Sequence, residues 1–547
     1  MRARCGVLGL LLVGLVSPAA RAGDTHYPGG TRPGELSEPL DPVEGCRGCH
    51  GDYDPADDHE PYDSWSASAM ANATRDPVFQ ASLSVAVQDR PDVGEYCLRC
   101  HTPQGWLDGR AEPGDGSGLD PERDHDGITC DSCHRMVDGT FVQNAIYYID
   151  PTRRKHAARD DVVDVGHGHV ADPFTGSARL CGTCHHVSSP VQPFLRDDGT
   201  EIEDSFPFET TYLEWEQSAF ATRGTTCIDC HMEPAPGVRT SAIEETPLRD
   251  SRRHGFLGSN AWLGRAVSAL SPALGREAAF DAQAERTREF LRTAARLEEL
   301  SAPARADAGE DIEVSVRVVN LTGHKLPTGY ADGRRMWLEV AIGDVVVSGA
   351  YDDAEAELSL DPPPKIWEAI HGVVGQGASF HLARQNTIVS DNRIPPEGFV
   401  PTARTAPVGA AFEGNWDDVT VQVRVPEGLE GTQTVRVRLR HQVLTRAYVE
   451  FLRDTNERDD RGEILWDVWS ATGRSAPEEI AEISTTLELE SPARTPTPTA
   501  IYLPSGGGCR AVWSNVDPGC AWLVPLLFVA IPRRRARRSS AEAAAVQ

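Results

Sequence analysis

Five copies of one pentapeptide, C-x-x-C-H, restrict what this chain can form more than any other feature of the sequence. The copies begin at Cys46, Cys97, Cys130, Cys181 and Cys227 and use ten of the 13 cysteines. At the cysteine and histidine frequencies of the chain, one chance copy is expected in roughly one chain in a hundred. Five copies therefore indicate repeated use of one chemistry.

Covalent haem attachment explains this spacing. Two cysteines separated by two residues can both add to the vinyl groups of one haem, and the following histidine then binds the iron from one face. Zinc is the alternative, but each pentapeptide offers three ligands whereas structural zinc sites use four. The sequence therefore predicts five haem c groups, with thioether bonds at Cys46, Cys49, Cys97, Cys100, Cys130, Cys133, Cys181, Cys184, Cys227 and Cys230, and with proximal iron ligands at His50, His101, His134, His185 and His231.

The haems are expected to form the core of the first half of the chain. All five motifs lie between Cys46 and Met232, where glycine and proline are frequent. A haem is a large apolar body, so we expect short helices and irregular loops to wrap the haems. With little protein between neighbouring haems, electrons should pass from one iron to the next.

The ligand on the far face of each iron separates a closed electron-transfer haem from one that is open to substrate. His254 follows the fifth motif in the segment RRHGFLGSN and is a distal candidate. His167 and His169 alternate in VGHGHVADPF, and we favour His169. His156 and Met70 are further candidates, with a solvated basic loop and core packing as their respective alternatives.

A long helix is expected to connect the two halves of the chain. Between Pro272 and Leu300, apolar residues recur at helical spacing on one face, and Glu and Arg lie opposite. The residues on the apolar face are Phe280, Ala284, Thr287, Leu291, Ala294 and Leu297.

Beyond Pro303 the hydrophobic period changes to two, which is typical of β-strands. Ile312, Val314, Val316 and Val318 alternate with polar residues, and turn residues separate several such runs. This pattern predicts an all-β sandwich of immunoglobulin-like architecture, without a catalytic constellation.

The loop NLTGHKLPTGY, which contains His324, has a rigid glycine and proline frame. Two interpretations stay open. His324 either reaches from the sandwich to an iron of the first half, or it bonds to the backbone of its own loop.

Several phrases resemble a family of secreted multihaem c-type cytochromes, similar to the cytochrome c554 and hydroxylamine-oxidoreductase group. These phrases include PYDSWSASAMANATRDPVF, YCLRCHTPQGW, GITCDSCHRM and NLTGHKLPTGYADGRRMWLEV. The resemblance covers roughly residues 40 to 470 and implies electron carriage. In that group, W-x-x-S-x-H segments commonly supply a distal histidine. Here Met70 and Phe220 stand at the histidine position, and phenylalanine cannot bind iron.

The two ends of the chain carry targeting signals. An apolar run between basic residues and Ala20-Arg21-Ala22 is typical of a secretory signal peptide, so we expect export to the periplasm or the outer cell surface. Near the C-terminus, a Pro/Thr/Gly linker, Cys509, an apolar run and an arginine cluster resemble the sorting tags of myxobacterial-type surface proteins. This resemblance implies a membrane or cell-surface tether. A Cys509–Cys520 disulfide is the alternative.

The net charge of −29, from 82 acidic and 53 basic residues, argues against a nucleic-acid partner. It favours a neutral or basic redox partner protein, although an acidic surface also serves solubility. The sequence therefore favours an exported electron carrier with no catalytic residues. The alternative is a multihaem oxidoreductase that acts on a small nitrogen or sulfur compound at one open haem.

The expected organisation is thus multi-domain, with a mainly irregular and helical haem-wrapped domain followed by a long helix and an all-β sandwich. The predicted segments are the signal peptide (1–22), the pentahaem cytochrome domain (23–260), the helical bridge (261–302), the β-sandwich (303–490), the linker (491–508) and the sorting or anchor segment (509–547).

Overall fold

The computed structural model describes residues 29–54, 59–161 and 166–490. The chain divides into two units, Met1–Pro492 and Ala493–Gln547, and the second unit lies wholly outside the described residues. The expected signal peptide, linker and sorting segment also lie outside them.

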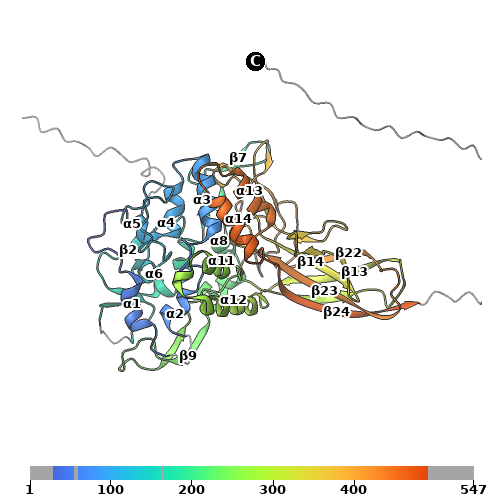
Figure 1. The fold of residues 1–547 in the computed structure, drawn as a ribbon, viewed down its shortest axis with the longest axis horizontal. Coiled ribbons are helices and arrows are strands. Elements are labelled where there is room, and N and C mark those ends of the chain that lie inside the picture. The colour runs from blue at the N-terminus through green and yellow to red at the C-terminus, as the bar shows by residue number, and fades with distance from the viewer. Residues whose placement is uncertain (1–28, 55–58, 162–165, 491–547) are drawn as a thin grey trace, which may run out of the picture. The chain divides into compact units, whose positions relative to one another are not determined.

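Short helices make up much of the first half of the chain (Figure 1). Proline opens α2, α3 and α5, a position where its missing N–H is not needed. The longest of these helices, α3, is capped by Asp76, whose side chain accepts a hydrogen bond from the backbone N–H of Val78. The helices are α1 (Val43–His50), α2 (Pro61–Ser66), α3 (Pro77–Asp89), α4 (Gly94–His101), α5 (Pro103–Leu107), α6 (Cys130–His134), α7 (Ala178–Gly182), α8 (Thr211–Glu216), α9 (Ala219–Arg223) and α10 (Cys227–His231).

Small two-stranded ladders join these helices. None of the strands in this region exceeds five residues, as expected for loops that wrap a large group. The pairs are β1 (Met136–Val137) with β2 (Tyr148–Ile149), β3 (Lys155–Ala157) with β4 (His169–Ala171), β5 (Val187–Ser188) with β8 (Pro207–Glu209), β6 (Phe194–Leu195) with β7 (Glu201–Glu203), and β9 (Pro234–Val238) with β10 (Arg249–Arg252).

The prediction of one helix from Pro272 to Leu300 is wrong at both ends. The structure has α11 (Leu263–Leu270) and a separate α12 (Glu277–Leu291), and the chain then enters strand β11 (Ala295–Ser301). The helical face from Phe280 to Leu291 is buried as expected. The period changes at Ala295, because burial there begins to alternate and the strand pairs with β13.

Two sheets share one core in the second half. The three-stranded sheet has the order β11-β13-β22, and the six-stranded sheet has the order β12-β24-β23-β14-β15, with β18 paired to β14. The immunoglobulin-like architecture stays a prediction. The strands are β12 (Arg305–Asp307), β13 (Asp311–Asn320), β14 (Arg335–Ile342), β15 (Val345–Ser348), β18 (Ile366–Trp367), β22 (Trp416–Arg424), β23 (Gly431–Gln442) and β24 (Glu478–Glu490).

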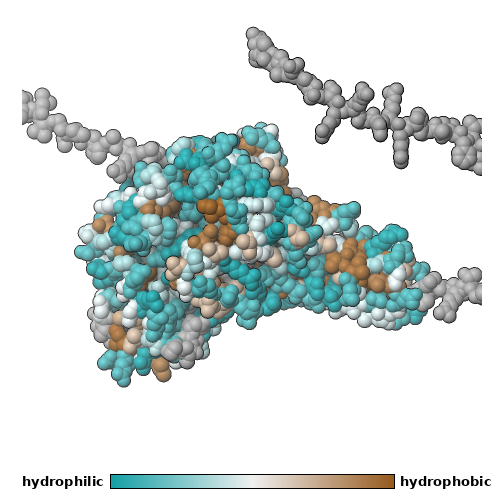
Figure 2. All heavy atoms as spheres, viewed as in Figure 1, coloured by the Kyte–Doolittle hydropathy of each residue, from teal (hydrophilic) through white to brown (hydrophobic). Residues whose placement is uncertain are grey.

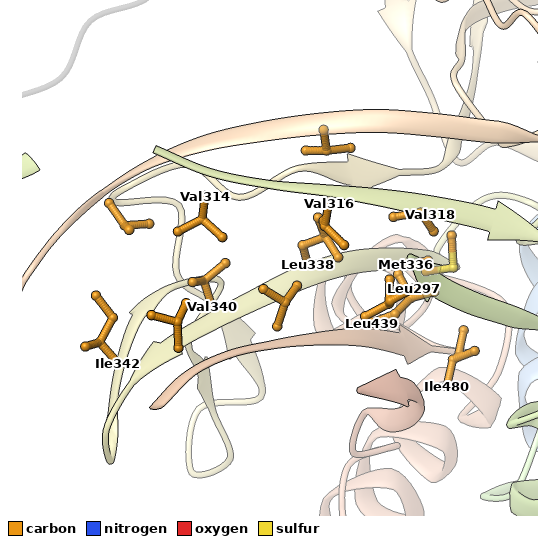
Figure 3. Packing of buried hydrophobic residues seen from close by; sticks show 14 of the residues in the cluster. Leu297, Val314, Val316, Val318, Met336, Leu338, Val340, Ile342, Leu439 and Ile480 are labelled. Atoms are coloured by element: carbon orange, nitrogen blue, oxygen red, sulfur yellow. The ribbon is translucent and has the colours of Figure 1, made fainter. Parts of the chain in front are cut away.

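Apolar side chains from the two sheets meet in this core (Figure 3). Val314, Val316 and Val318 project from β13, and Leu338 and Val340 project from the facing strand β14. The alternation that predicted the strands therefore also defines their buried face.

Smaller elements line the edge of the sheets that is near the helical region. They include strands β19 (Ala369–Val373) and β21 (Thr387–Asp391), which pair with each other, and β20 (Gly377–Ala378), which pairs with β19. A separate hairpin pairs β16 (Tyr351–Asp352) with β17 (Glu357–Leu358).

Two helices interrupt the predicted all-β region. Helices α13 (Arg446–Thr455) and α14 (Arg461–Ala471) pack against each other and against α3 (Figure 1). Buried residues of α13 and α14 form one hydrophobic cluster with Ala81 and Val85 of α3. The second half of the chain is therefore joined to the haem region by an apolar interface of its own.

The drawn face of the molecule is mostly hydrophilic, with small separate hydrophobic patches (Figure 2). In the described part of the chain, no helix is both long and apolar enough to cross a membrane.

Candidate haem centres

Each C-x-x-C-H motif coincides with a short helical turn. The turn contains the whole motif in α1, α4, α6 and α10, whereas α7 ends inside the fourth motif at Gly182. Positions i and i+3 of a helix share one face, so the two thiols of each motif point the same way and the histidine follows them. A capping box between Thr226 and Asp229 fixes the start of the turn in the fifth motif.

Backbone carbonyls set the orientation of four proximal imidazoles. Because a carbonyl can only accept a hydrogen bond, each Nδ1 carries the proton and each Nε2 keeps a lone pair that can bind a metal. The Nδ1 donors and their carbonyl acceptors are His50 to Thr240 (2.8 Å), His101 to Ala73 (3.2 Å), His134 to His156 (2.8 Å) and His231 to Leu257 (2.5 Å).

Burial keeps these imidazoles neutral. Desolvation lowers the pKa of His101 and of His231 to about 4, and it also lowers the pKa of His50 and His134. A neutral imidazole is the form that binds a metal.

Three proximal histidines face a second histidine from a distant part of the sequence. The ring centroids of His50 and His167 lie 6.3 Å apart, those of His134 and His254 lie 6.3 Å apart, and those of His231 and His324 lie 6.2 Å apart. Two imidazoles on opposite faces of one iron, each with an iron–nitrogen bond of about 2 Å, place their centroids about 6.3 Å apart. The three pairs therefore have the spacing that a bis-histidine haem requires.

The second histidine of each pair is oriented like the proximal one. Nδ1 of His254 donates to the Arg252 carbonyl (3.1 Å), Nδ1 of His324 donates to the Lys325 carbonyl (2.9 Å), and Nδ1 of His167 donates to the Gly168 carbonyl (3.3 Å). Burial lowers the pKa of His254 to about 3 and also lowers that of His324. In each pair both Nδ1 atoms thus bond to backbone carbonyls, which leaves Nε2 of both rings available to a metal.

The remaining two motifs differ. His101 is stacked on Phe79 with ring centroids 3.7 Å apart, and the side chain of His185 is 54% exposed with Nδ1 3.9 Å from a carboxylate oxygen of Glu209. Within the described ranges, no second imidazole ring pairs with either of them. The residues therefore fit haem at all five motifs, and they fit bis-histidine ligation at three.

Other distal candidates lie in different settings. The sequence favours His169 over His167 as a distal ligand. In the structure, however, it is the ring of His167 that faces the ring of His50. The Nε2 atom of His169 is buried without a hydrogen-bond partner in the described structure. Met70 lies in a turn, and its carbonyl accepts a hydrogen bond from the backbone N–H of Ile128 (3.0 Å), so its role as a ligand stays a prediction.

His156 has no nitrogen left for an iron, which corrects its place among the distal candidates. Its Nδ1 bonds to Asp172 (2.9 Å) and its Nε2 bonds to Asp150 (2.9 Å). It is a buried structural histidine rather than the solvated residue that its basic neighbours suggested.

Sequence reasoning missed His186. Its Nδ1 donates to the Val142 carbonyl (2.9 Å), as in the candidate ligands, and its Nε2 is buried and lacks a hydrogen-bond partner among the described residues. Its position directly after a proximal histidine gave no signal of this.

Phe220, which replaces the histidine of the resembled family, packs under the loop that carries His324. A side chain added at Gly323 would lie 3.3 Å from the rings of both Phe220 and Trp215. The glycine therefore permits a close approach of the loop to helices α8 and α9, and this approach brings His324 to His231.

Neighbouring motifs touch through their cysteines. The thiols of Cys46 and Cys130, of Cys100 and Cys184, and of Cys181 and Cys227 lie close enough to interact, and the interaction lowers the pKa of one thiol in each pair. The first motif thus adjoins the third, and the fourth adjoins both the second and the fifth. Groups bound at these sites would lie close together.

The five motifs and the three imidazole pairs are candidate sites for c-type haem. A family model described as cytochrome c554 and c-prime matches residues 45–135, which is less than half of the chain and contains the first three motifs. A cytochrome c family implies covalently bound haem c, and the match supports an electron-transfer role.

Comparisons with solved structures give weaker likenesses. A penta-heme cytochrome c552 from Thermochromatium tepidum is 17% identical, with 81% of this chain and 100% of that chain covered and a TM-score of 0.47. The Pseudomonas fluorescens alkylpurine DNA glycosylase AlkC, bound to DNA containing an abasic site analog, is 9% identical over 41% of this chain and 45% of that chain, with a TM-score of 0.14. Scores below 0.5 establish neither the fold nor a function of this chain. No curated protein matches it.

Proposed function

We propose that the chain is an exported pentahaem c-type cytochrome that carries electrons between redox partner proteins. The observation that carries this proposal is the set of three imidazole pairs with centroids 6.2–6.3 Å apart, each containing the histidine of a C-x-x-C-H motif. When bound, haem supplies a reversible one-electron iron couple, and two imidazole ligands close that iron to substrate. The chain's own backbone carbonyls orient the six imidazoles through their Nδ1 atoms.

The contacts between motifs support transfer along an array. The fourth motif adjoins two others, so it connects the second motif to the fifth. Cys49 and Cys230, in the first and fifth motifs, are exposed, which suits electron entry and exit at those two motifs.

A redox titration of the purified holoprotein tests the carrier function. We expect every haem to be reduced and reoxidised reversibly, and a basic partner to exchange electrons faster at low ionic strength because the chain carries a net charge of −29. Haems that remain oxidised at every accessible potential would contradict the proposal.

A second candidate function is chemistry on a small ligand at the second or fourth haem. It is favoured by His101 and His185, which face no second imidazole in the described ranges, and by the exposure of the His185 side chain. A high-spin ferric signal that disappears on addition of cyanide would support an open haem. An entirely low-spin spectrum that cyanide leaves unchanged would exclude it.

Export and tethering belong to the proposal through the signal-like N-terminus and the arginine-rich C-terminus. We expect a chain that ends at Gly508 to be released into the medium or periplasm with its haems in place, while the full chain stays with the envelope. Equal release of both chains would contradict the tether.

A further inference from the structure

A cluster of four charged side chains is buried where the loop that carries His324 meets helix α8. Its members are Glu214, Lys325, Asp391 and Arg393. Glu214 belongs to α8 in the haem region, whereas the other three belong to the second half of the chain. The cluster therefore joins the two halves beside the fifth haem motif.

Both cationic side chains of the cluster, Lys325 and Arg393, bind the carboxylate of Asp391. Nζ of Lys325 lies 2.6 Å from one of its oxygens, and Arg393 binds the carboxylate through two nitrogens, each at 2.8 Å. The same guanidinium reaches Glu214 at 3.0 Å. Two positive and two negative charges thus balance one another out of contact with water.

Glu214 also holds the backbone of the loop. It accepts hydrogen bonds from the Lys325 backbone N–H (3.0 Å) and from the hydroxyls of Thr328 (3.2 Å) and Thr210 (2.8 Å). A second contact between the halves joins the hydroxyls of Thr211 and Thr328 at 2.7 Å. The carboxylate is therefore the point at which α8 fixes the loop.

The hydrogen bonds of the loop hold the backbone on both sides of His324. Asn320 donates to the His324 carbonyl (2.8 Å) from one side, and Lys325, the next residue along the chain, is anchored on the other. Removing one member of a buried charge cluster leaves a partner unpaired, which is strongly destabilising. The loop therefore has one favourable position, and in it the His324 ring lies 6.2 Å from the ring of His231.

We propose that Glu214 is a positioning residue, which acts through Lys325 and Arg393 to hold His324 as the sixth ligand of the fifth haem. The second half of the chain then completes a haem site instead of only covering it. This inference rests on the proposed pentahaem function.

The substitution Glu214→Gln in the holoprotein tests the inference. It keeps the side-chain length but removes the negative charge that balances Arg393. We expect a high-spin ferric signal from up to about one-fifth of the iron, because one haem of five loses its sixth ligand. Added imidazole should restore the low-spin spectrum, and Glu214→Asp, which keeps the charge, should show a smaller high-spin fraction than Glu214→Gln.

Glu216→Gln is the matched control, because Glu216 lies on the same helix with its side chain exposed. It should leave the spin state unchanged. If Glu214→Gln fails to fold, Thr328→Val removes one donor to Glu214 at little cost in volume, and a smaller high-spin fraction that imidazole reverses is expected.

Two outcomes separate the possible failures. A variant that is less stable than the native protein but keeps five low-spin or unchanged haems overturns the positioning role and leaves the pentahaem function intact. A native protein without haem at the fifth motif overturns the proposed function itself.

Discussion

At the residue scale, the distal histidines can be tested one at a time. His254 is held by a hydrogen bond from its backbone N–H to the Ser64 hydroxyl (2.9 Å) and faces His134. We expect His254→Gly to convert one low-spin haem to high-spin and added imidazole to reverse the change, as read by electron paramagnetic resonance.

The control for this variant is His125→Gln, which lies nine residues before His134 but faces no second imidazole ring in the described part of the chain. It should keep the native spectrum. If the His254→Gly protein also keeps it, then another group binds the iron of the third motif.

His156 should behave in the opposite way. Its bonds to Asp150 and Asp172 are buried, and hydrogen bonds from His156 and Thr152 outweigh desolvation and lower the pKa of Asp150. We expect His156→Ala to lower the free energy of unfolding by about 3 kcal/mol in urea titrations, with no change in spin state. A new high-spin signal would instead identify His156 as a ligand.

The proximal ligands could be predicted from the sequence and the distal ligands could only be named as candidates, because only the proximal ligands belong to a short sequence motif. The proximal histidines follow from a five-residue motif, because the covalent chemistry itself sets the spacing. A distal ligand such as His324 is selected by tertiary packing, which is why its two interpretations stayed open. His169 is paired within the ladder between β3 and β4, and His167, just before the ladder, faces His50. This pairing could not be predicted from the alternation of the two histidines.

At the element scale, alternation predicted strands β13, β22 and β23 well, because burial alternates along each of them, whereas β14 is buried on both faces. The helical pattern beyond Leu291 failed. Ala294 and Leu297 fit the helical spacing, but Ala295 and Leu297 also fit the period of two, and the segment pairs with β13 as a strand. Helices α13 and α14 were missed because their apolar faces pack on α3, which is far away in the sequence.

Buried carboxylates connect several of these elements and should make stability depend on acid. Burial alone would raise the pKa of Asp332, but its interactions with His371 and Gln385 outweigh burial and lower it. Arg393 and Lys325 likewise lower the pKa of Asp391 against the effect of burial. A lowered folded-state pKa contributes stability above the unfolded value of about 3.9, and that stability is lost as pH falls through the folded value.

We therefore expect the free energy of unfolding to fall already between pH 7 and pH 5, because burial lowers the pKa of histidines such as His254 and His441 and the unfolded chain takes up their protons first. It should fall further below about pH 4, where the carboxylates are protonated. Asp332→Asn should lower stability at pH 7 and make the acid decline shallower. Asp353→Asn, at an exposed aspartate, should reproduce the native profile. A native profile that stays flat down to pH 3 would show that these carboxylates are not held as the structure places them.

At the scale of the whole molecule, the two halves form one unit around a row of candidate haem sites. The buried cluster at Glu214 and the apolar interface between α3, α13 and α14 both cross between the halves. The proposed binding of His324 to the fifth iron requires this rigidity, because a shift of one half would move His324 away from His231.

The number of covalent haems tests this account most directly. The holoprotein should be produced in a host that attaches haem c, and its intact mass and pyridine haemochrome absorbance should be measured together. We predict five haems per chain. The double variant Cys227→Ala/Cys230→Ala should lose one of them. A colourless protein with the mass of the bare polypeptide, or a protein whose ten motif cysteines remain free thiols, would contradict it.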